Sequence, residues 1–270
     1  MKHQATSIAV AGGPALWAAS CVVTLLAGCT GEPPEHGLRM LAEGRRLLQA
    51  GQPQAAVQQL DQFLRDFART TRGGEGYYLR GEAYFRQKDY DRARADFLQA
   101  LNRSSDRLVR GNADAALGDL AQRRAEMPAA EDYYTDALAL LPPSEPPSDA
   151  VAVRLGEVLQ QAGKWEQADT QFHRVIHTFP GSDAAGQAGR LVNARAWTVC
   201  AGRFTDPQAA AAQARQLQQS RHEARVEVMF GDKGPVHAVC VGRFNTRPEG
   251  RAKLAEIQPL LAKAELAVTK

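Results

Sequence analysis

The chain has 270 residues, of which 44% are hydrophobic and 23% are charged, and its formal net charge is only +3. This composition excludes a disordered chain and a multi-span membrane protein, and the small net charge argues against nucleic acid as a partner. Four cysteines are too few for a scaffold held together by disulfides. The length predicts about two domains.

The first segment, residues 1–29, has the pattern of an export signal. Lys2 provides a basic start, and no charged residue lies between Ile8 and Leu26. A short apolar run after a basic start is typical of a signal peptide. The run ends in Leu26-Ala27-Gly28-Cys29, which resembles the lipobox of bacterial lipoproteins. The resemblance implies removal of residues 1–28, lipidation of Cys29 and attachment to a membrane through this lipid anchor.

Alternatives to the lipobox are a plain signal peptide and an N-terminal anchor helix. Thr30 follows the cysteine, in place of the aspartate that resembles an inner-membrane retention signal, so the pattern favours a periplasmic location at the outer membrane. Residues 29–36 are polar and predict a tether. Beyond residue 29 no apolar run is long enough to span a bilayer.

The next segment, residues 37–182, repeats itself four times. Four glycines are spaced 37, 37 and 38 residues apart, an alanine follows each by twelve residues, and a large apolar residue follows that alanine by four. Such a register predicts helix pairs, in which glycine and alanine permit close crossing and the large residue fills the remaining space. The positions are Gly44, Gly81, Gly118 and Gly156, then Ala56, Ala93, Ala130 and Ala168, then Leu60, Phe97, Tyr134 and Phe172.

This pattern resembles the tetratricopeptide repeat (TPR), with three or four residues added to its usual unit, and the stretch from Tyr77 to Ala93 matches best. The resemblance implies an all-α solenoid with a concave groove that binds a peptide or protein partner. Residues 183–195 are predicted to form a capping helix and linker. The positions that follow each glycine by one are predicted to line the groove, and they are Arg45, Glu82, Asp119 and Glu157.

Three of these four groove candidates are acidic, which favours a basic or amide-rich partner. The alternative is that they form only a solvated helix face. His173 and His177 stand four residues apart but lack a third ligand nearby, so the sequence predicts neither a metal site nor a cofactor.

Residues 196–270 predict a small α+β domain. The hexapeptide from Val199 to Phe204 recurs forty residues later, from Val239 to Phe244, and a helix start follows each copy. Alternation over residues 224–230 predicts a half-buried strand, and residues 266–268 predict a short last strand. The order is βαββαβ, a ferredoxin-like sandwich with one helix-covered face and one open face. The whole chain is therefore predicted to be multidomain.

The domain resembles the SPOR (sporulation-related) domain in its order of elements and in the motifs W-T-V-x-x-G-x-F and V-x-V-G-x-F. The resemblance implies binding of peptidoglycan glycan strands that have lost their stem peptides, at the division septum. The predicted glycan-binding residues are Arg203, His237 and Arg243, with Cys200 and Cys240; Cys200 stands where the family commonly has glutamine. The alternative is an unrelated ferredoxin-like module with a protein-contact role.

Cys200 and Cys240 share one strand phase, opposite to that of Val199 and Val239. The resemblance makes their strands neighbours, and an exported compartment is oxidising, so a disulfide between them is predicted, with two free thiols as the alternative. From Trp197 to Lys270 eleven basic and seven acidic residues give a net charge of +4, which suits an anionic polymer.

We find no catalytic motif in the sequence, such as a nucleophile elbow, a phosphate loop or paired carboxylates. We therefore predict a non-enzymatic lipoprotein adaptor of the cell envelope. Its expected partners are an unidentified protein in the TPR groove and peptidoglycan glycan strands. The alternative is a TPR scaffold of an outer-membrane assembly or secretion complex, in which the C-terminal domain serves as a protein contact.

Overall fold

A computed structural model describes residues 31–231 and 234–269 of the chain. The predicted signal peptide, its predicted cleavage site and Cys29, the predicted lipidation site, lie outside the described residues. Within the described part, helices come first and a sheet with two further helices follows. The helices of the first part are α1 (Glu35–Gln49), α2 (Pro53–Phe67), α3 (Gly73–Arg86), α4 (Tyr90–Arg103), α5 (Arg107–Arg123), α6 (Met127–Leu140), α7 (Ser148–Gln161), α8 (Trp165–Thr178) and α9 (Asp183–Leu191).

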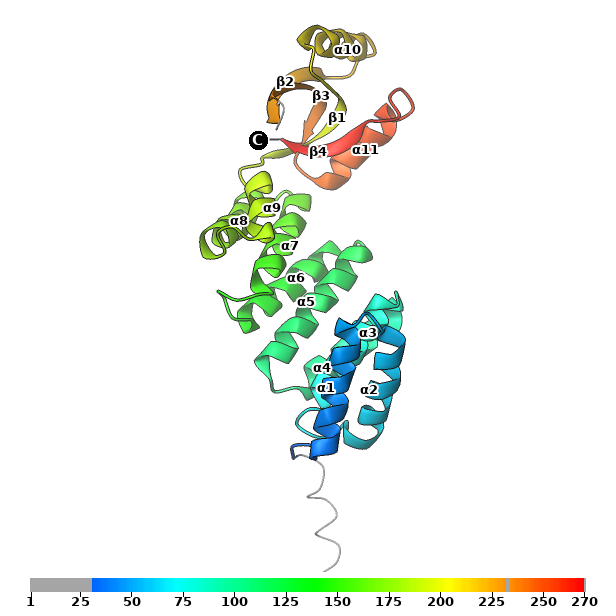
Figure 1. Cartoon of the computed structure of the whole chain (residues 1–270). Helices are drawn as coiled ribbons and strands as arrows, with labels where there is room; N and C mark the ends of the chain where they lie inside the picture. The colour runs from blue at the N-terminus through cyan, green and yellow to red at the C-terminus, as the bar shows by residue number, and fades with distance from the viewer. Residues whose placement is uncertain (1–30, 232–233, 270) are drawn as a thin grey trace, which may run out of the picture.

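The first eight helices form four antiparallel pairs that stack into a solenoid (Figure 1). Each pair is one of the predicted repeats, and α1 begins at Glu35, two residues before the predicted start. The solenoid core is a chain of apolar clusters, each shared between neighbouring helix pairs. None of the described helices is long and apolar enough to cross a bilayer.

The repeated glycine sits where the two helices of a pair cross. A Cβ atom added at Gly118 would lie 2.5 Å from Cε1 of Tyr134, and one added at Gly81 would lie 2.7 Å from Cε1 of Phe97. In both cases the opposing ring belongs to the large residue predicted to fill the gap, and both rings are buried. The repeat register inferred from the sequence is therefore confirmed by the packing.

Helix α9 covers the last repeat, as predicted. Ser182 caps its N-terminus by accepting a hydrogen bond from the backbone N–H of Ala185, and Ala188 is fully buried against the last repeats. At the other end, Nε2 of Gln160 donates to the carbonyl of Leu191. The helix ends there, and a four-residue connection leads to the next domain.

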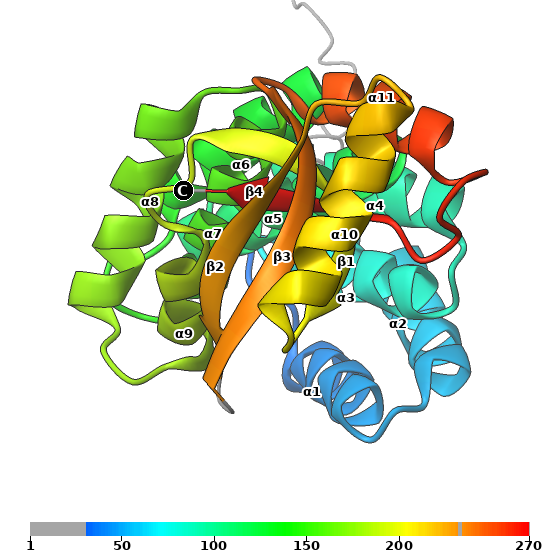
Figure 2. The same ribbon diagram turned by 90° about the horizontal axis from the view of Figure 1, so that it is seen from above.

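The C-terminal domain has the predicted βαββαβ order. It comprises β1 (Ala196–Phe204), α10 (Pro207–Gln219), β2 (Ala224–Gly231), β3 (Gly234–Phe244), α11 (Arg247–Ile257) and β4 (Glu265–Thr269). The strand order is β2-β3-β1-β4, with antiparallel neighbours throughout. Helices α10 and α11 cover one face, where Val199, Val239 and Val241 form a core with Leu217 and Ile257 (Figure 2).

The sequence predicts a helix over about residues 248–263 that Pro259 kinks or shortens, and α11 has the shortened form. It ends at Ile257, two residues before Pro259. Proline has no backbone N–H, so Pro259 cannot donate the hydrogen bond that would continue the helix.

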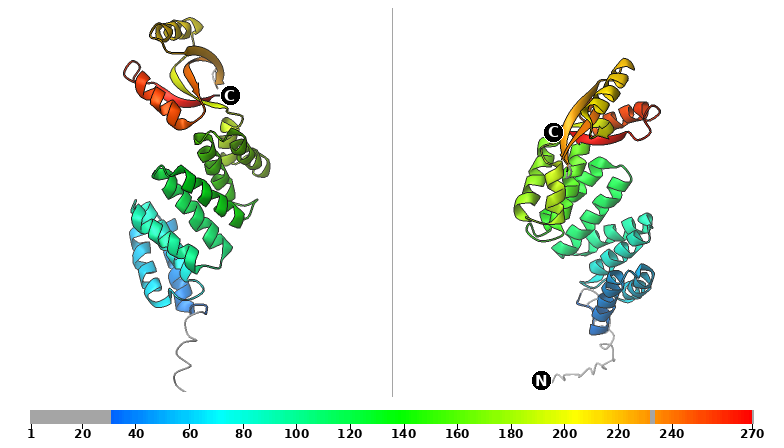
Figure 3. Two further views of the ribbon diagram at one scale, coloured as in Figure 1. Left: turned by 180° about the vertical axis from the view of Figure 1, so that it is seen from behind. Right: turned by 45° about the horizontal axis from the view of Figure 1, so that its top comes forward.

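The C-terminal domain lies against the α7–α9 end of the solenoid (Figure 3). Two tryptophans join these two parts. Trp165 donates from Nε1 to Oδ1 of Asn245 over 2.9 Å, and Trp197 donates from Nε1 to the carbonyl of Gln160 over 2.9 Å. The two indole rings lie 6.3 Å apart, and the guanidinium of Arg247 lies 5.9 Å from the Trp197 ring. Trp165 is buried and Trp197 is half-buried, and the satisfied N–H groups of both rings make this a packed junction.

Candidate functional site

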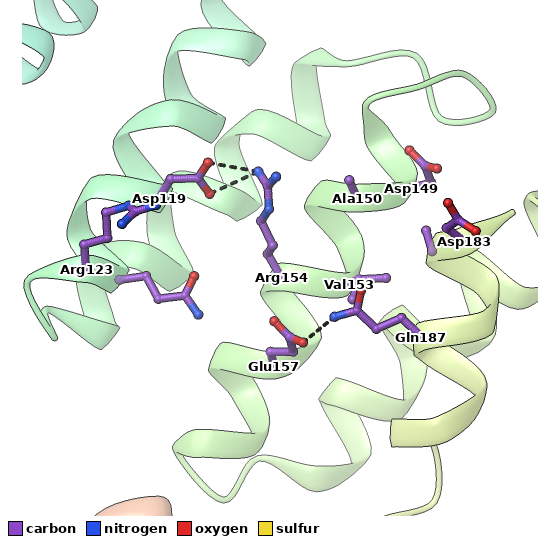
Figure 4. A pocket seen from close by; sticks show the side chains of 11 residues that line it. Asp119, Arg123, Asp149, Ala150, Val153, Arg154, Glu157, Asp183 and Gln187 are labelled. Atoms are coloured by element: carbon purple, nitrogen blue, oxygen red, sulfur yellow. Dashed lines mark hydrogen bonds and ion pairs between the residues drawn. The ribbon is translucent and has the colours of Figure 1, made fainter. Parts of the chain in front are cut away.

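The C-terminal half of the solenoid groove is a cleft of about 660 Å³ between α5, α7 and α9 (Figure 4). Two predicted groove residues, Asp119 and Glu157, both line it. Nη1 of Arg154 lies 3.0 Å from each carboxylate oxygen of Asp119, and Nε2 of Gln187 donates to Oε1 of Glu157 over 2.6 Å. Side chains from three successive repeat helices therefore meet in one cleft.

The cleft is acidic. Four carboxylates and two arginines line it. Asp149 and Asp183, in the first turns of α7 and α9, have neither a hydrogen-bond nor an ion-pair partner for their side chains among the described residues. Burial raises the pKa of Glu157, although the hydrogen bond from Gln187 opposes the shift. Uncompensated carboxylates attract a cationic group, so this half of the groove is suited to a basic ligand.

The N-terminal half of the groove is a second cleft, of about 420 Å³, between α1, α3 and α5. The other two predicted groove residues, Arg45 and Glu82, line it. Arg45 pairs with Glu75 of α3, and burial raises the pKa of Glu82. Apolar side chains, including the exposed Leu108, lie beside these charges. All four predicted positions thus line clefts on helices α1, α3, α5 and α7.

Sequence reasoning missed Asp149, Arg154 and Asp183. It searched only the position that follows each repeated glycine, whereas these residues lie at other turns of the same helices or on the capping helix. A search at intervals of three and four residues along the same helix face would have found Arg154, three residues before Glu157.

The open face of the C-terminal sheet holds a third cleft, of about 700 Å³. Cys200 and Cys240 lie on its floor and Arg203 lies at its side. His237 and Arg243 do not line it. His237 has the strand phase of Val239 and Val241, which pack on the helix-covered side. Arg243 follows Gly242, whose φ of +68° interrupts the regular strand. The structure therefore brings together three of the five predicted glycan-binding residues.

The two cysteines face each other directly across β1 and β3, and both are free thiols in the structure. Burial, and then the charge of Glu227, raises the pKa of Cys240 to about 12; burial also raises the pKa of Cys200. A protonated thiol is a poor nucleophile in disulfide exchange. Their opposed positions agree with the predicted strand phase, and the disulfide stays a prediction.

Models of known families match two parts of the solenoid. The family described as tetratricopeptide repeat matches residues 41–107 and again residues 150–182. These two segments are tetratricopeptide repeats. The first covers most of α1 and all of α2 to α4, and the second covers nearly all of α7 and all of α8. A search of curated proteins gives no match to the chain.

Solved TPR structures resemble the chain over little more than half its length. MamA is 19% identical over 58% of this chain and 82% of its own, with a TM-score of 0.45. YrrB, described as a TPR protein with an unusual peptide-binding site, is 22% identical over 56% of this chain and 74% of its own, with a TM-score of 0.45. A TPR protein from Parabacteroides merdae is 14% identical over 57% of this chain and 58% of its own, with a TM-score of 0.47.

Proposed function

We propose that the protein is a non-enzymatic adaptor of the cell envelope, which binds a partner protein in its TPR groove and peptidoglycan glycan strands on its C-terminal domain. The observation that carries the proposal is the groove itself: side chains from α5, α7 and α9 converge on a cleft with unpaired carboxylates. A solenoid of helix pairs presents such a surface to an extended ligand.

The partner that best fits the groove is an extended segment with apolar and basic side chains. The N-terminal half of the groove offers apolar contact beside balanced charges, whereas the C-terminal half carries the unpaired Asp149 and Asp183. A lysine or arginine of the partner would find its counter-charges there. Because Asp119 is already neutralised by Arg154, the two unpaired aspartates are the residues expected to select for positive charge.

Site-specific crosslinking tests the groove. A photo-reactive amino acid at Ala150, which lines the acidic cleft, is expected to crosslink the full chain to a partner in intact cells. The same group at Thr170, which is exposed on α8 outside the cleft, is the matched control. We expect the crosslink at residue 150 to disappear in the Asp149→Lys, Asp183→Lys double variant. Equal crosslinking from both positions, or no effect of the double variant, would refute the proposal for the groove.

For the C-terminal domain, the support is its fold and its charge. Its strand order leaves one sheet face uncovered by α10 and α11, and this face carries a cleft floored by small side chains. The net charge of +4 from Trp197 to Lys270 suits an anionic wall polymer. We propose that this face is the glycan-binding surface of a SPOR-like domain, with Arg203 beside the floor of Cys200 and Cys240.

Co-sedimentation with purified sacculi tests this half of the proposal. The full mature chain is expected to sediment with sacculi, and more of it after an amidase has removed the stem peptides. Arg203→Glu is expected to weaken this binding, whereas Arg215→Glu, on the exposed side of α10, is the matched control. Failure of the wild-type chain to sediment with stripped sacculi would overturn the glycan part and leave the groove part standing.

The alternative function is a TPR scaffold of an outer-membrane assembly or secretion complex, with the C-terminal domain as a protein contact. The observation that favours it lies on β2, an edge strand of the sheet, where Val228 and Met229 are exposed. Exposed apolar residues on an unpaired edge are typical of a surface that pairs with another chain. On this alternative, Val228→Lys would impair assembly. Because Val228 also lines the cleft on the open face, binding of the wild-type chain to stripped sacculi, and not the behaviour of this variant, separates the two functions.

Anchoring through Cys29 completes the proposal. A lipid-anchored chain at the periplasmic side of the outer membrane would hold the groove and the sheet face near the wall. Metabolic labelling with a fatty acid is expected to mark the wild-type chain and not Cys29→Ser. Labelling of both chains, or of neither, would contradict lipidation at this residue.

A further inference from the structure

The cleft on the open sheet face is built by both domains. Its floor consists of small side chains, from Cys200, Ala238, Cys240 and Ala267. Its rim includes Arg190, which belongs to α9 of the solenoid and not to the C-terminal domain. In Figure 2 α9 lies on the side of the sheet opposite to α10 and α11. A ligand on this face therefore meets a side chain of the last solenoid helix.

The short connection between α9 and β1 fixes this arrangement. Asp169 of α8 accepts a hydrogen bond from the backbone N–H of Asn193 over 2.8 Å and pairs with Arg195 over 2.6 Å. The backbone N–H of Arg195 in turn donates to the carbonyl of Thr269, at the end of β4. With both ends of the connection held, α9 is kept beside the edge of the open face.

The charges at the cleft are satisfied within the molecule except at one residue. Arg203 pairs with Glu265, and Glu227 pairs with Arg225 and accepts a hydrogen bond from Thr269. Burial acts to raise the pKa of Glu227, but these hydrogen bonds outweigh it and the pKa is lowered, so the carboxylate stays ionised. The guanidinium of Arg190 is exposed and has no hydrogen-bond or ion-pair partner among the residues that the structure describes.

We propose that Arg190 binds a carboxylate of a glycan strand lying on the open sheet face, so that the solenoid and the sheet hold one ligand together. This inference rests on the proposed glycan binding and adds its chemistry. Hydrolysis of the amide bond between a stem peptide and the glycan leaves a free carboxylate on the sugar and an amine on the peptide. A stripped strand therefore carries carboxylates that an intact one lacks, and an unpaired guanidinium is the group that binds them best.

The shape of the cleft agrees with this ligand. Small side chains on the floor leave depth for sugar rings, while Arg190 stands at the rim where a carboxylate projecting from a ring would reach it. The floor carries no charge of its own, because both thiols are kept protonated by burial. Selection between stripped and intact strands would then come from the rim and not from the floor.

Isothermal titration of the full mature chain with soluble glycan fragments tests the inference. The two ligands are stripped fragments and the same fragments with their carboxylates converted to methylamides. The variants are Arg190→Ala and, as the matched control, Arg215→Ala on exposed α10. A charge-assisted hydrogen bond at an exposed rim predicts about tenfold weaker binding of stripped fragments by the Arg190 variant and an unchanged Kd for the control. Blocking the carboxylates is expected to weaken binding by the wild-type chain by the same factor of about ten, and to leave the Kd of the Arg190 variant unchanged.

The outcomes separate the two proposals. If the wild-type chain binds stripped fragments and Arg190→Ala binds them equally well, the role of Arg190 is overturned while glycan binding stands. If Arg190→Ala weakens both ligands equally, the residue contacts the sugar without reading the carboxylate, and the inference also fails. If the wild-type chain binds neither ligand, the proposed glycan binding itself fails, and the role of Arg190 with it.

Discussion

Replacing Gly118 by alanine tests the packing rule on which the whole solenoid depends. The added Cβ would lie 2.5 Å from Cε1 and 2.6 Å from Cδ1 of Tyr134. The ring has no room to retreat, since Tyr134 is fully buried and its hydroxyl donates to Oδ1 of Asp119 over 2.7 Å. Helix α5 must therefore move away from α6, or the tyrosine must leave its hydrogen bond.

The magnitude follows from two opposing effects. Overpacking a filled core costs about 1–3 kcal/mol. Alanine in place of a helical glycine gains about 0.5–1 kcal/mol, because glycine loses more backbone freedom on folding. The net expectation for Gly118→Ala is a loss of up to about 2.5 kcal/mol. If the Tyr134 ring moves and breaks its hydrogen bond to Asp119, the substitution would also disturb the groove that Asp119 lines.

The matched control is Gly189→Ala on α9, where the added Cβ would have no neighbour within 4 Å. Only the gain in helix propensity applies there, so this variant is expected to be more stable than wild type by about 0.5–1 kcal/mol. The gain in helix propensity is common to both variants, so they differ by the overpacking cost of about 1–3 kcal/mol. Thermal unfolding followed by circular dichroism should place them roughly 2–12 °C apart. If Gly118→Ala melts at or above the temperature of Gly189→Ala, the close crossing at the repeated glycine is refuted.

Three further predictions concern titration, thiol reactivity and the domain junction. Burial, and then the charge of Asp136, raises the pKa of Asp114 to about 6, so the stability that the protonated carboxyl contributes is lost as the pH rises from about 4 to 6. Asp114→Asn should raise the free energy of unfolding at pH 7 by up to about 3 kcal/mol in urea titrations, and it should remove this loss of stability with pH. A plot of unfolding free energy against pH that runs parallel to that of wild type would contradict this prediction. Cys240 should react with iodoacetamide at pH 8 at least about a hundredfold more slowly in the folded chain than in urea, and equal rates would show an accessible thiolate. Asn245→Ala removes the acceptor of the Trp165 N–H and should lower the free energy of unfolding by about 1–3 kcal/mol, and an unchanged value would mean that the junction carries no stability.

The repeat architecture was predictable because its signal is local and periodic. The spacing of Gly81, Ala93 and Phe97 recurs four times, and each recurrence constrains the same helix crossing. The order of helices and strands along the C-terminal domain was equally accessible, because alternation and turn residues are recognised over a few positions. The last helix was expected to run to about residue 263 unless Pro259 shortened it, and it ends six residues earlier, just before that proline.

The sites were harder to predict because they depend on phase and on distant contacts. His237 was assigned to the open face from its polarity, yet it shares the phase of two valines that pack under the helices. Arg190 was not singled out, since nothing near it in the sequence indicates that a sheet lies beside α9. A sequence reports which face a residue occupies on its own element, and the neighbour of that face is set by the tertiary fold.

The junction decides whether the two proposed binding surfaces, the groove and the open sheet face, would act separately or together. Hydrogen bonds from two indole N–H groups and an ion pair at Asp169 hold the sheet against α7 and α8 over a connection of four residues. A flexible linker would let a groove-bound partner and a sheet-bound glycan diffuse independently, and each would sample a wide range of separations. The packed junction instead sets one separation, so the effective concentration of one ligand near the other depends on this geometry. Gly163, at a φ of +75°, lies against Asn245 in that contact, so even the turn between α7 and α8 takes part in orienting the sheet.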